Sequence, residues 1–249
     1  KLMFSGNAGD WIFKVEGDFG QAAGNDGSFQ LDDAWLGYDF GNGWSVYMGQ
    51  GKVPLQREWL VHSSNQLAVE RSIASYYQPG GRTQGFMLSY EADTWKFMGS
   101  FNDGFTNATA AGTPPTFGFP QQNSNTPVVP TNGQPATGAG VDTEYALSGR
   151  IEFLFGGTWD QFEDFTSAPG SESGFMAGLG WHMQNDEYGV AMPDDKVRTY
   201  SVSLDGSYEA DGWNLFGAFT WTKYDNDADA GAPSLDQDVM SIVFQGGLY

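Results

Sequence analysis

Four basic side chains gather in the span 52–82 of this chain, against only two acids. The bases are Lys52, Arg57, Arg71 and Arg82, and the acids are Glu58 and Glu70. Charged side chains act on ions at close range when they stand at the narrow part of an aqueous pore. If the chain forms such a pore, we expect this segment to fold against or into its interior and to form part of the constriction. The alternative is that the arginines pair with the two glutamates or bind lipopolysaccharide phosphates.

Further charged residues stand at alternating positions, so they would share one face of their β-strands. These candidates for the lining of a water-filled interior are Lys14, Glu16, Asp18, Asp33, Lys96, Arg150, Glu152 and Asp205. The whole chain has Lys+Arg 11 against Asp+Glu 31, a formal net charge of −20. An interior with acid in excess would concentrate cations, which predicts a mild cation preference. Ion pairs between strands of the wall are the alternative role.

Metal and catalytic chemistry has weak support in the sequence. Asp225, Asp227 and Asp229 alternate in an expected outer loop, and carboxylate oxygens suit Ca²⁺. The EF-hand pattern next requires Gly, whereas this chain has Ala230 and no closing Glu, so a solvated acidic loop is favoured. The chain has Cys 0 and His 2, and no nucleophile stands beside an oriented base. We therefore expect no other metal site, no cofactor and no enzymatic activity.

Alternation with a period of two residues is the dominant structural signal, and it is typical of β-strands. In 10–19, Trp11 and Phe13 share one face while Lys14 and Glu16 share the other. The same pattern predicts about eleven strands, at 2–6, 10–19, 30–40, 44–53, 82–91, 95–102, 145–155, 175–184, 197–208, 213–224 and 238–248. A helix is expected at most within 55–77. We predict one all-β antiparallel domain over residues 1–249.

The connections between these strands alternate in length. Short turns at 41–43, 91–94 and 209–212 alternate with long connections at 20–28, 54–81, 104–143, 185–196 and 225–237. We expect 156–174 to be a longer turn that lies at the same end of the strands as the short turns. Transmembrane barrels have short periplasmic turns, long outer loops and aromatic girdles at both interfaces. The aromatic residues near strand ends are Trp11, Phe40, Trp44, Tyr90, Trp95, Tyr208 and Trp213. These features favour an antiparallel transmembrane β-barrel over a soluble β-sandwich.

The composition is compatible with that interpretation. Mean hydropathy is −0.40 and no apolar run reaches the length of a spanning helix. A barrel strand needs an apolar surface on one face only, so its mean hydropathy stays polar. The negative charge argues against nucleic acid, whose phosphates need a basic surface, and against docking on anionic lipid through a polybasic face.

Residues 30–54, QLDDAWLGYDFGNGWSVYMGQGKVP, resemble a characteristic stretch of the phosphate-selective porin O and P family. Asp33-Ala34-Trp35 corresponds to the family's acidic-Ala-aromatic strand, and 49–54 corresponds to its Gly-x-x-Lys-x-Pro strand end. Further matches follow in the family's order at 70–72, 82–85, 101–104, 149–151 and 245–249. The resemblance implies a sixteen-stranded, usually trimeric diffusion channel of the bacterial outer membrane.

Two features depart from that family. About eleven strands are too few for the implied barrel, so we expect strands to be missing at the C-terminus and at the N-terminus. Phosphate-selective members attract anions with many Lys and Arg, and this chain is strongly acidic. Selectivity for phosphate is therefore not expected here.

The function expected from these features is passive diffusion of ions and small hydrophilic solutes. The expected partners are outer-membrane lipid, lipopolysaccharide and two further copies of the chain in a homotrimer. One alternative is a sugar-selective porin in which Trp35, Trp59, Tyr76 and Tyr77 form an aromatic slide. The others are a structural or anchoring outer-membrane protein with a plugged barrel, and a soluble all-β binding module.

Overall fold

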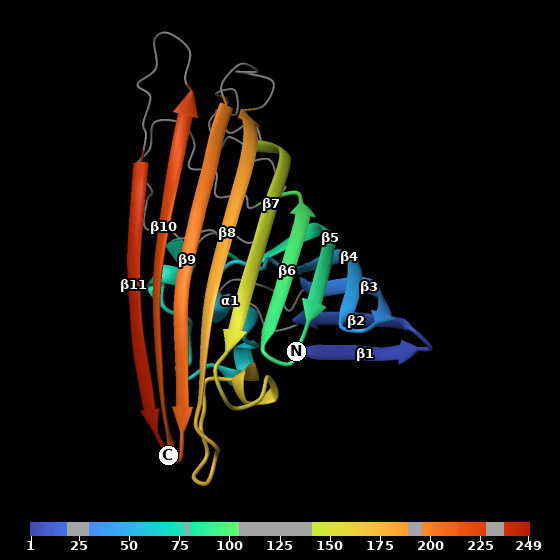
Figure 1. Cartoon of the computed structure of the whole chain (residues 1–249). Helices are drawn as coiled ribbons and strands as arrows, with labels where there is room; N and C mark the ends of the chain where they lie inside the picture. The colour runs from blue at the N-terminus through green and yellow to red at the C-terminus, as the bar shows by residue number, and fades with distance from the viewer. Residues whose placement is uncertain (19–29, 78–79, 105–140, 189–195, 228–236) are drawn as a thin grey trace.

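The computed structural model describes residues 1–18, 30–77, 80–104, 141–188, 196–227 and 237–249. Within them, eleven antiparallel strands form one sheet in which each strand pairs with its neighbours in sequence (Figure 1). The strands are β1 (Leu2–Ala8), β2 (Trp11–Asp18), β3 (Gln30–Gly41), β4 (Trp44–Lys52), β5 (Arg82–Glu91), β6 (Trp95–Asn102), β7 (Val141–Leu154), β8 (Gly174–Tyr188), β9 (Lys196–Ala210), β10 (Trp213–Asp227) and β11 (Gln237–Leu248). The all-β antiparallel prediction is confirmed.

The sheet is strongly curved but not closed. In Figure 1 the long strands β7–β11 stand side by side, while β1–β3 run nearly across them. Strands β1 and β11 form the two edges. Several strands extend beyond their expected bounds, and β7 begins at Val141 rather than at 145.

In the part of the chain that the structure describes, the helical elements are short and lie in two connections. The β4–β5 connection contains α1 (Arg57–Leu60), the 3₁₀ turn η1 (Ser63–Asn65) and α2 (Ile73–Tyr77), and the β7–β8 connection contains the 3₁₀ turn η2 (Asp160–Glu163). No helix in the described part of the chain is long and apolar enough to cross a membrane.

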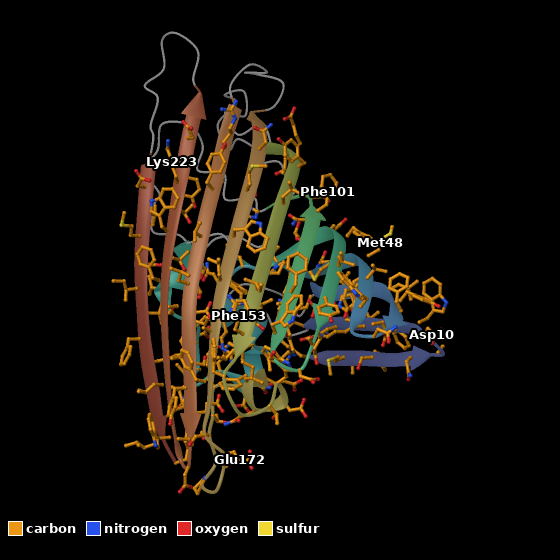
Figure 2. The ribbon with its side chains drawn as sticks, in the orientation of Figure 1. Asp10, Met48, Phe101, Phe153, Glu172 and Lys223 are labelled. Carbon is orange, nitrogen blue, oxygen red and sulfur yellow. The ribbon has the colours of Figure 1, made fainter. Side chains whose placement is uncertain are left out.

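In a soluble protein the exposed face of a sheet is polar and the buried face is apolar, and in this sheet the arrangement is reversed. On one face, called the outer face, apolar side chains are exposed; Met48, Phe101 and Phe153, labelled in Figure 2, are 67%, 57% and 43% exposed. On the other face, called the inner face, charged side chains such as Glu16 and Arg150 are buried. This inversion follows from the alternating sequence, and it suits a wall with lipid outside and polar groups inside.

Aromatic rings gather at the end of the sheet where the shorter connections lie. The ring of Tyr90 packs against Trp44 and Trp95, with ring centroids 4.8 Å apart in both pairs. Tyr208 and Trp213 form a similar pair with centroids 5.0 Å apart. The first group lies at the ends of β4–β6 and the second at the ends of β9 and β10, and both are parts of an aromatic girdle of the kind found at membrane interfaces.

The β3–β4 turn shows why its sequence is Gly-Asn-Gly. Gly41, Asn42 and Gly43 have φ values of 72°, 54° and 83°, in the left-handed region that favours Gly and Asn. A Cβ on Gly43 would also lie 2.1 Å from the carbonyl oxygen of Glu91 in the neighbouring turn. The close approach of the two turns therefore requires glycine at this position.

Candidate functional site

The segment 53–77, here called the inner segment, packs against the inner face of the sheet. Val53 and Leu55 are fully buried at its start. Val61 packs against Phe165 of the β7–β8 connection and Phe216 of β10. The chain thus leaves β4, crosses the interior to contact β8–β10 and returns to β5. The role of this segment in a constriction, expected for 52–82, remains a proposal.

Two glycines of β8 make room for this crossing. A Cβ on Gly180 would lie 2.1 Å from the carbonyl oxygen of Leu55, and a Cβ on Gly178 would lie 2.0 Å from Nη2 of Arg150. Both glycines face inward, at positions where a side chain would displace the inner segment or the guanidinium. The wall is therefore bare of side chains where these groups contact it.

Arg57 fastens the inner segment to two other parts of the wall. Its Nε donates to the hydroxyl of Ser207 on β9 at 2.9 Å. Its Nη2 donates to the carbonyl oxygens of Phe162 at 2.7 Å and Asp164 at 3.2 Å. The guanidinium also lies 5.1 Å from the ring centroid of Phe165. Burial lowers the pKa of Arg57 from its usual value.

Arg150 also binds the inner segment to the wall. Its side chain is fully buried and binds both carboxylate oxygens of Asp205, with both N–O distances 2.7 Å. Its Nε donates to Glu152 at 2.6 Å, and Nη1 also donates to the carbonyl oxygen of Leu55 at 3.1 Å. A planar guanidinium suits this arrangement because it has five donors in a fixed geometry. Arg150, Glu152 and Asp205 thus form an ion-pair cluster that holds the inner segment.

Arg71 and Glu58 organise the inner segment itself. The carboxylate of Glu58 accepts hydrogen bonds from the backbone amide of Ser72 at 2.7 Å and from the hydroxyls of Ser72 and Ser75. Arg71 donates from Nε to the main-chain carbonyl of Glu58 at 2.9 Å, and its guanidinium lies 4.5 Å from the ring centroid of Trp59. Trp59 is buried and donates to the carbonyl oxygen of Ser75. Trp59 is therefore enclosed within this segment.

A second ion-pair cluster lies on β2, β3 and β5. Lys14 contacts Asp33 at 2.6 Å and Glu16 at 2.8 Å. Arg82 contacts Asp33 at 2.5 Å and Asp32 at 3.5 Å. At the cluster's edge, His62 contacts Glu16 at 3.0 Å, and Lys1 pairs with Asp32 and with Asp18, the latter at 4.0 Å.

Asp32 enters this cluster through a β-bulge that sequence reasoning missed. In the β2–β3 register Glu16 pairs with Asp33 while Gly17 pairs with Leu31, so Asp32 is the extra residue. Neighbouring residues of a regular strand face opposite sides, but a bulge brings two of them to one side. Asp32 and Asp33 are both buried and both contact Arg82. Spacing alone gave no signal for this bulge.

Of the remaining candidates, Lys96 lies beside the first cluster as the register partner of Glu152 across β6–β7, whereas Asp225 lies apart from both clusters. Lys96 contacts Glu91 at 2.7 Å and lies 4.5 Å from the ring centroid of Trp159. Asp225 contacts Lys223 at 3.7 Å. The side chain of Asp227 and all of Asp229 lie outside the described residues, so the Ca²⁺ site stays a prediction. Among the described residues no group of three or more His, Asp or Glu side chains could hold a metal ion.

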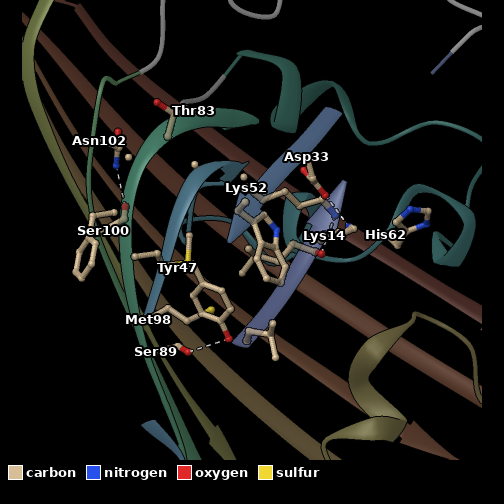
Figure 3. A pocket seen from close by; sticks show the side chains of 18 residues that line it. Lys14, Asp33, Tyr47, Lys52, His62, Thr83, Ser89, Met98, Ser100 and Asn102 are labelled. Carbon is tan, nitrogen blue, oxygen red and sulfur yellow. Dashed lines mark hydrogen bonds and ion pairs between the residues drawn. The ribbon is translucent and has the colours of Figure 1, made fainter. Parts of the chain in front are cut away.

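A cavity of about 410 Å³ lies between the inner face of β2–β6 and the inner segment (Figure 3). Three of the expected site residues line it, Lys14, Asp33 and Lys52. Lys52 donates to the carbonyl oxygens of Leu60 at 2.9 Å and Val61 at 3.2 Å.

The aromatic residues proposed for a sugar slide are not assembled as expected. Trp35 lines the cavity, with Tyr47 packed edge-on against it at 4.9 Å between centroids. Trp59 is buried elsewhere, under Arg71. The side chains of Tyr76 and Tyr77 lie outside the described residues.

Comparison with known proteins identifies one family. The family model described as "Phosphate-selective porin O and P" matches residues 1–150. This range includes β1–β6, the inner segment and most of β7. No curated protein matches the chain.

Proposed function

Because the chain belongs to the phosphate-selective porin O and P family, a family of bacterial outer-membrane porins, we propose that it forms a passive, water-filled channel. It lets ions and small hydrophilic solutes diffuse across the outer membrane and catalyses no reaction. The observation that supports this proposal is the polarity of the sheet, with apolar side chains exposed outside and charged side chains inside. A pore wall needs this distribution, because lipid contacts one face and water the other.

The inner segment forms the constriction of this channel in our proposal. Arg57 and Arg150 tether it from one side of the wall to the other. Such fixed tethers hold a loop inside a barrel at a constant position, so the free cross-section stays narrow. The two ion-pair clusters then border the remaining aqueous path.

The channel is not selective for phosphate in this proposal. Lys14, Arg82 and Arg150 already have carboxylate partners within 4 Å, so their charges are largely compensated. Outside these clusters Glu58 and Glu209 are buried, whereas most other acids of the described residues are exposed at turns and strand ends: Asp10, Asp39, Glu91, Asp93, Asp103, Asp160, Glu163, Glu172, Asp211 and Asp238. Exposed charges act over about a Debye length, roughly 8 Å in physiological salt. We therefore propose at most a weak cation preference.

Single-channel recording tests the proposal. The purified protein in a planar bilayer under a KCl gradient should give stepwise conductance and a reversal potential close to zero, shifted slightly toward the cation value. Addition of inorganic phosphate should leave the chloride current unblocked. A folded, β-rich protein without any conductance would contradict the channel, and strong phosphate block would contradict the lack of phosphate selectivity.

A second candidate is an anchoring protein with a filled barrel. Polar side chains on the inner face are buried, including His182, Ser201 and Thr222. They also bond to one another or to neighbours, as in the 2.7 Å contact between Ser201 and Thr222. A filled interior would give no conductance in the same experiment. Sugar selectivity is the third candidate, and the inward position of Trp35 supports it.

We also propose that the protein is a homotrimer that contacts lipopolysaccharide. The exposed apolar side chains of the outer face must meet either lipid or another subunit. Native mass spectrometry in a mild detergent should give a mass of three chains, and retained lipopolysaccharide should add to it. A monomer free of bound lipid would contradict both points.

A further inference from the structure

The cavity beside Lys52 has the size and lining of a small-molecule site. Its volume of about 410 Å³ lies in the range of known ligand sites, roughly 300–1,000 Å³. Figure 3 shows Lys14, Asp33 and His62 together at one end and Ser100 and Asn102 at the other. Trp35, Tyr47, Met87 and Met98 give the space between them a largely apolar lining.

Lys52 carries the one feature of this cavity that favours an anion. Its ammonium donates to two neutral carbonyl oxygens, those of Leu60 and Val61. An ammonium has three N–H donors, so one donor remains for a ligand. Among the described residues no carboxylate oxygen lies within 4 Å of this nitrogen. By contrast, Lys14 in the same lining has Asp33 and Glu16 as partners.

The apolar part of the lining favours a ligand with a ring. Trp35 is held edge-on by Tyr47, and the wall next to it consists of Gly49 and Gly51. Gly51 is close to this ring, because a Cβ there would lie 3.5 Å from Cδ1 of Trp35. Because Gly51 has no side chain to cover the indole, a flat apolar group can lie along it.

We propose that this cavity binds a small organic monocarboxylate, with its carboxylate on the ammonium of Lys52 and its ring against Trp35. The inference rests on the proposed function only in that the ligand reaches the cavity from the aqueous interior. Inorganic phosphate fits poorly, because a dianion needs several donors and the cavity has one uncompensated cation. A sugar fits less well, because the hydroxyls of Tyr47 and Ser89 already bond within a cluster that includes Ser45.

Calorimetry with sodium benzoate tests the site in the purified, detergent-solubilised protein. Benzoate should bind with saturable one-to-one stoichiometry. Benzamide, its neutral analogue, should bind at least about ten-fold more weakly, because it lacks the charge that the ammonium recognises. This comparison needs no variant. Equal affinity for the two compounds, or tighter binding of inorganic phosphate or glucose than of benzoate, would overturn the proposal.

Lys52→Met keeps the length of the side chain and removes its charge, so benzoate affinity should fall by about ten-fold or more. The matched control is Lys223→Met, which removes a lysine at the far end of β10 beside Asp225 and should leave benzoate affinity unchanged. An unchanged affinity of the Lys52→Met variant for benzoate would contradict the proposal. Benzoate binding without conductance would refute the channel alone, and conductance without benzoate binding would refute this site alone.

Discussion

Arg57 and Ser207 are 150 residues apart in the sequence, and their side chains are joined by a 2.9 Å hydrogen bond between Nε and Oγ. This bond connects the inner segment to β9, on the opposite side of the interior from β4. The same guanidinium reaches the carbonyl of Phe162 in the β7–β8 connection. One side chain therefore fixes the position of a loop relative to two distant parts of the wall.

Replacing Arg57 with Ala should release the inner segment. Loss of the charged hydrogen bonds should lower the free energy of unfolding by about 2 kcal/mol or more, and single-channel current should become larger and noisier. Heat-dependent mobility on gels and bilayer recording measure the two effects. Arg57→Lys should recover only part of the stability, because one ammonium cannot span Ser207 and Phe162 together. Identical conductance in wild type and Arg57→Ala would show that this tether does not control the pore.

Replacing Arg150 with Met should destabilise the protein by about 3–5 kcal/mol, because Glu152 and Asp205 would remain buried without their partner. The triple variant Arg150→Met, Glu152→Gln, Asp205→Asn should be more stable than the single variant, since it removes the stranded charges as well. Thermal unfolding followed by circular dichroism compares the two proteins. A triple variant less stable than the single one would contradict the electrostatic explanation.

Gly180→Ala should displace the inner segment, because the new Cβ would lie 2.1 Å from a backbone oxygen that cannot rotate away. We expect altered conductance together with a lower unfolding temperature. Gly217→Ala is the matched control on β10, where the nearest atom would be 3.6 Å away, an ordinary contact. Equal effects of the two substitutions would mean that glycine is needed only for the strand itself.

Arg82→Met should shift ion selectivity toward cations. It removes one of the two positive partners of each of Asp32 and Asp33, so that only Lys1 and Lys14 still compensate these carboxylates. The reversal potential in a KCl gradient should move toward the cation value, and the shift should shrink in concentrated salt. Asp39→Asn, an exposed acid near the β3–β4 turn, should change the potential little. A shift toward anions in Arg82→Met would contradict the placement of these groups along the ion path.

Much of the wall follows from alternation in the sequence. Parity alone assigned Lys14, Glu16, Arg150, Glu152 and Asp205 to one face, and they do lie on the inner face. Their pairing could not be predicted, because partners such as Arg150 and Asp205 lie on strands that are not adjacent in the sheet. Their contact depends on side-chain length and on the missing side chain at Gly178.

The periodicity of the sequence also could not predict the bulge at Asp32 or the path of the inner segment. A bulge shifts the pairing by one residue without changing the composition of the strand. The inner segment has no periodic pattern, and its position is set by contacts such as that between Leu55 and Gly180. The pairing of these charges is also beyond periodicity: each acid of the two clusters has a basic neighbour, so the expected cation preference depends on how much charge the ion pairs leave uncompensated.

The tethers of the inner segment also bear on the order of assembly. Every pairing in the described sheet joins strands that follow one another in the chain, and contacts of low sequence separation form faster because they lose less loop entropy. The contacts of Arg57 with Ser207 and Phe162, and of Leu55 with Arg150, span 150, 105 and 95 residues. They become available only when β7–β9 have formed. We therefore expect the wall to form before the inner segment docks, so that the chain passes through a stage that is wider inside than the finished protein.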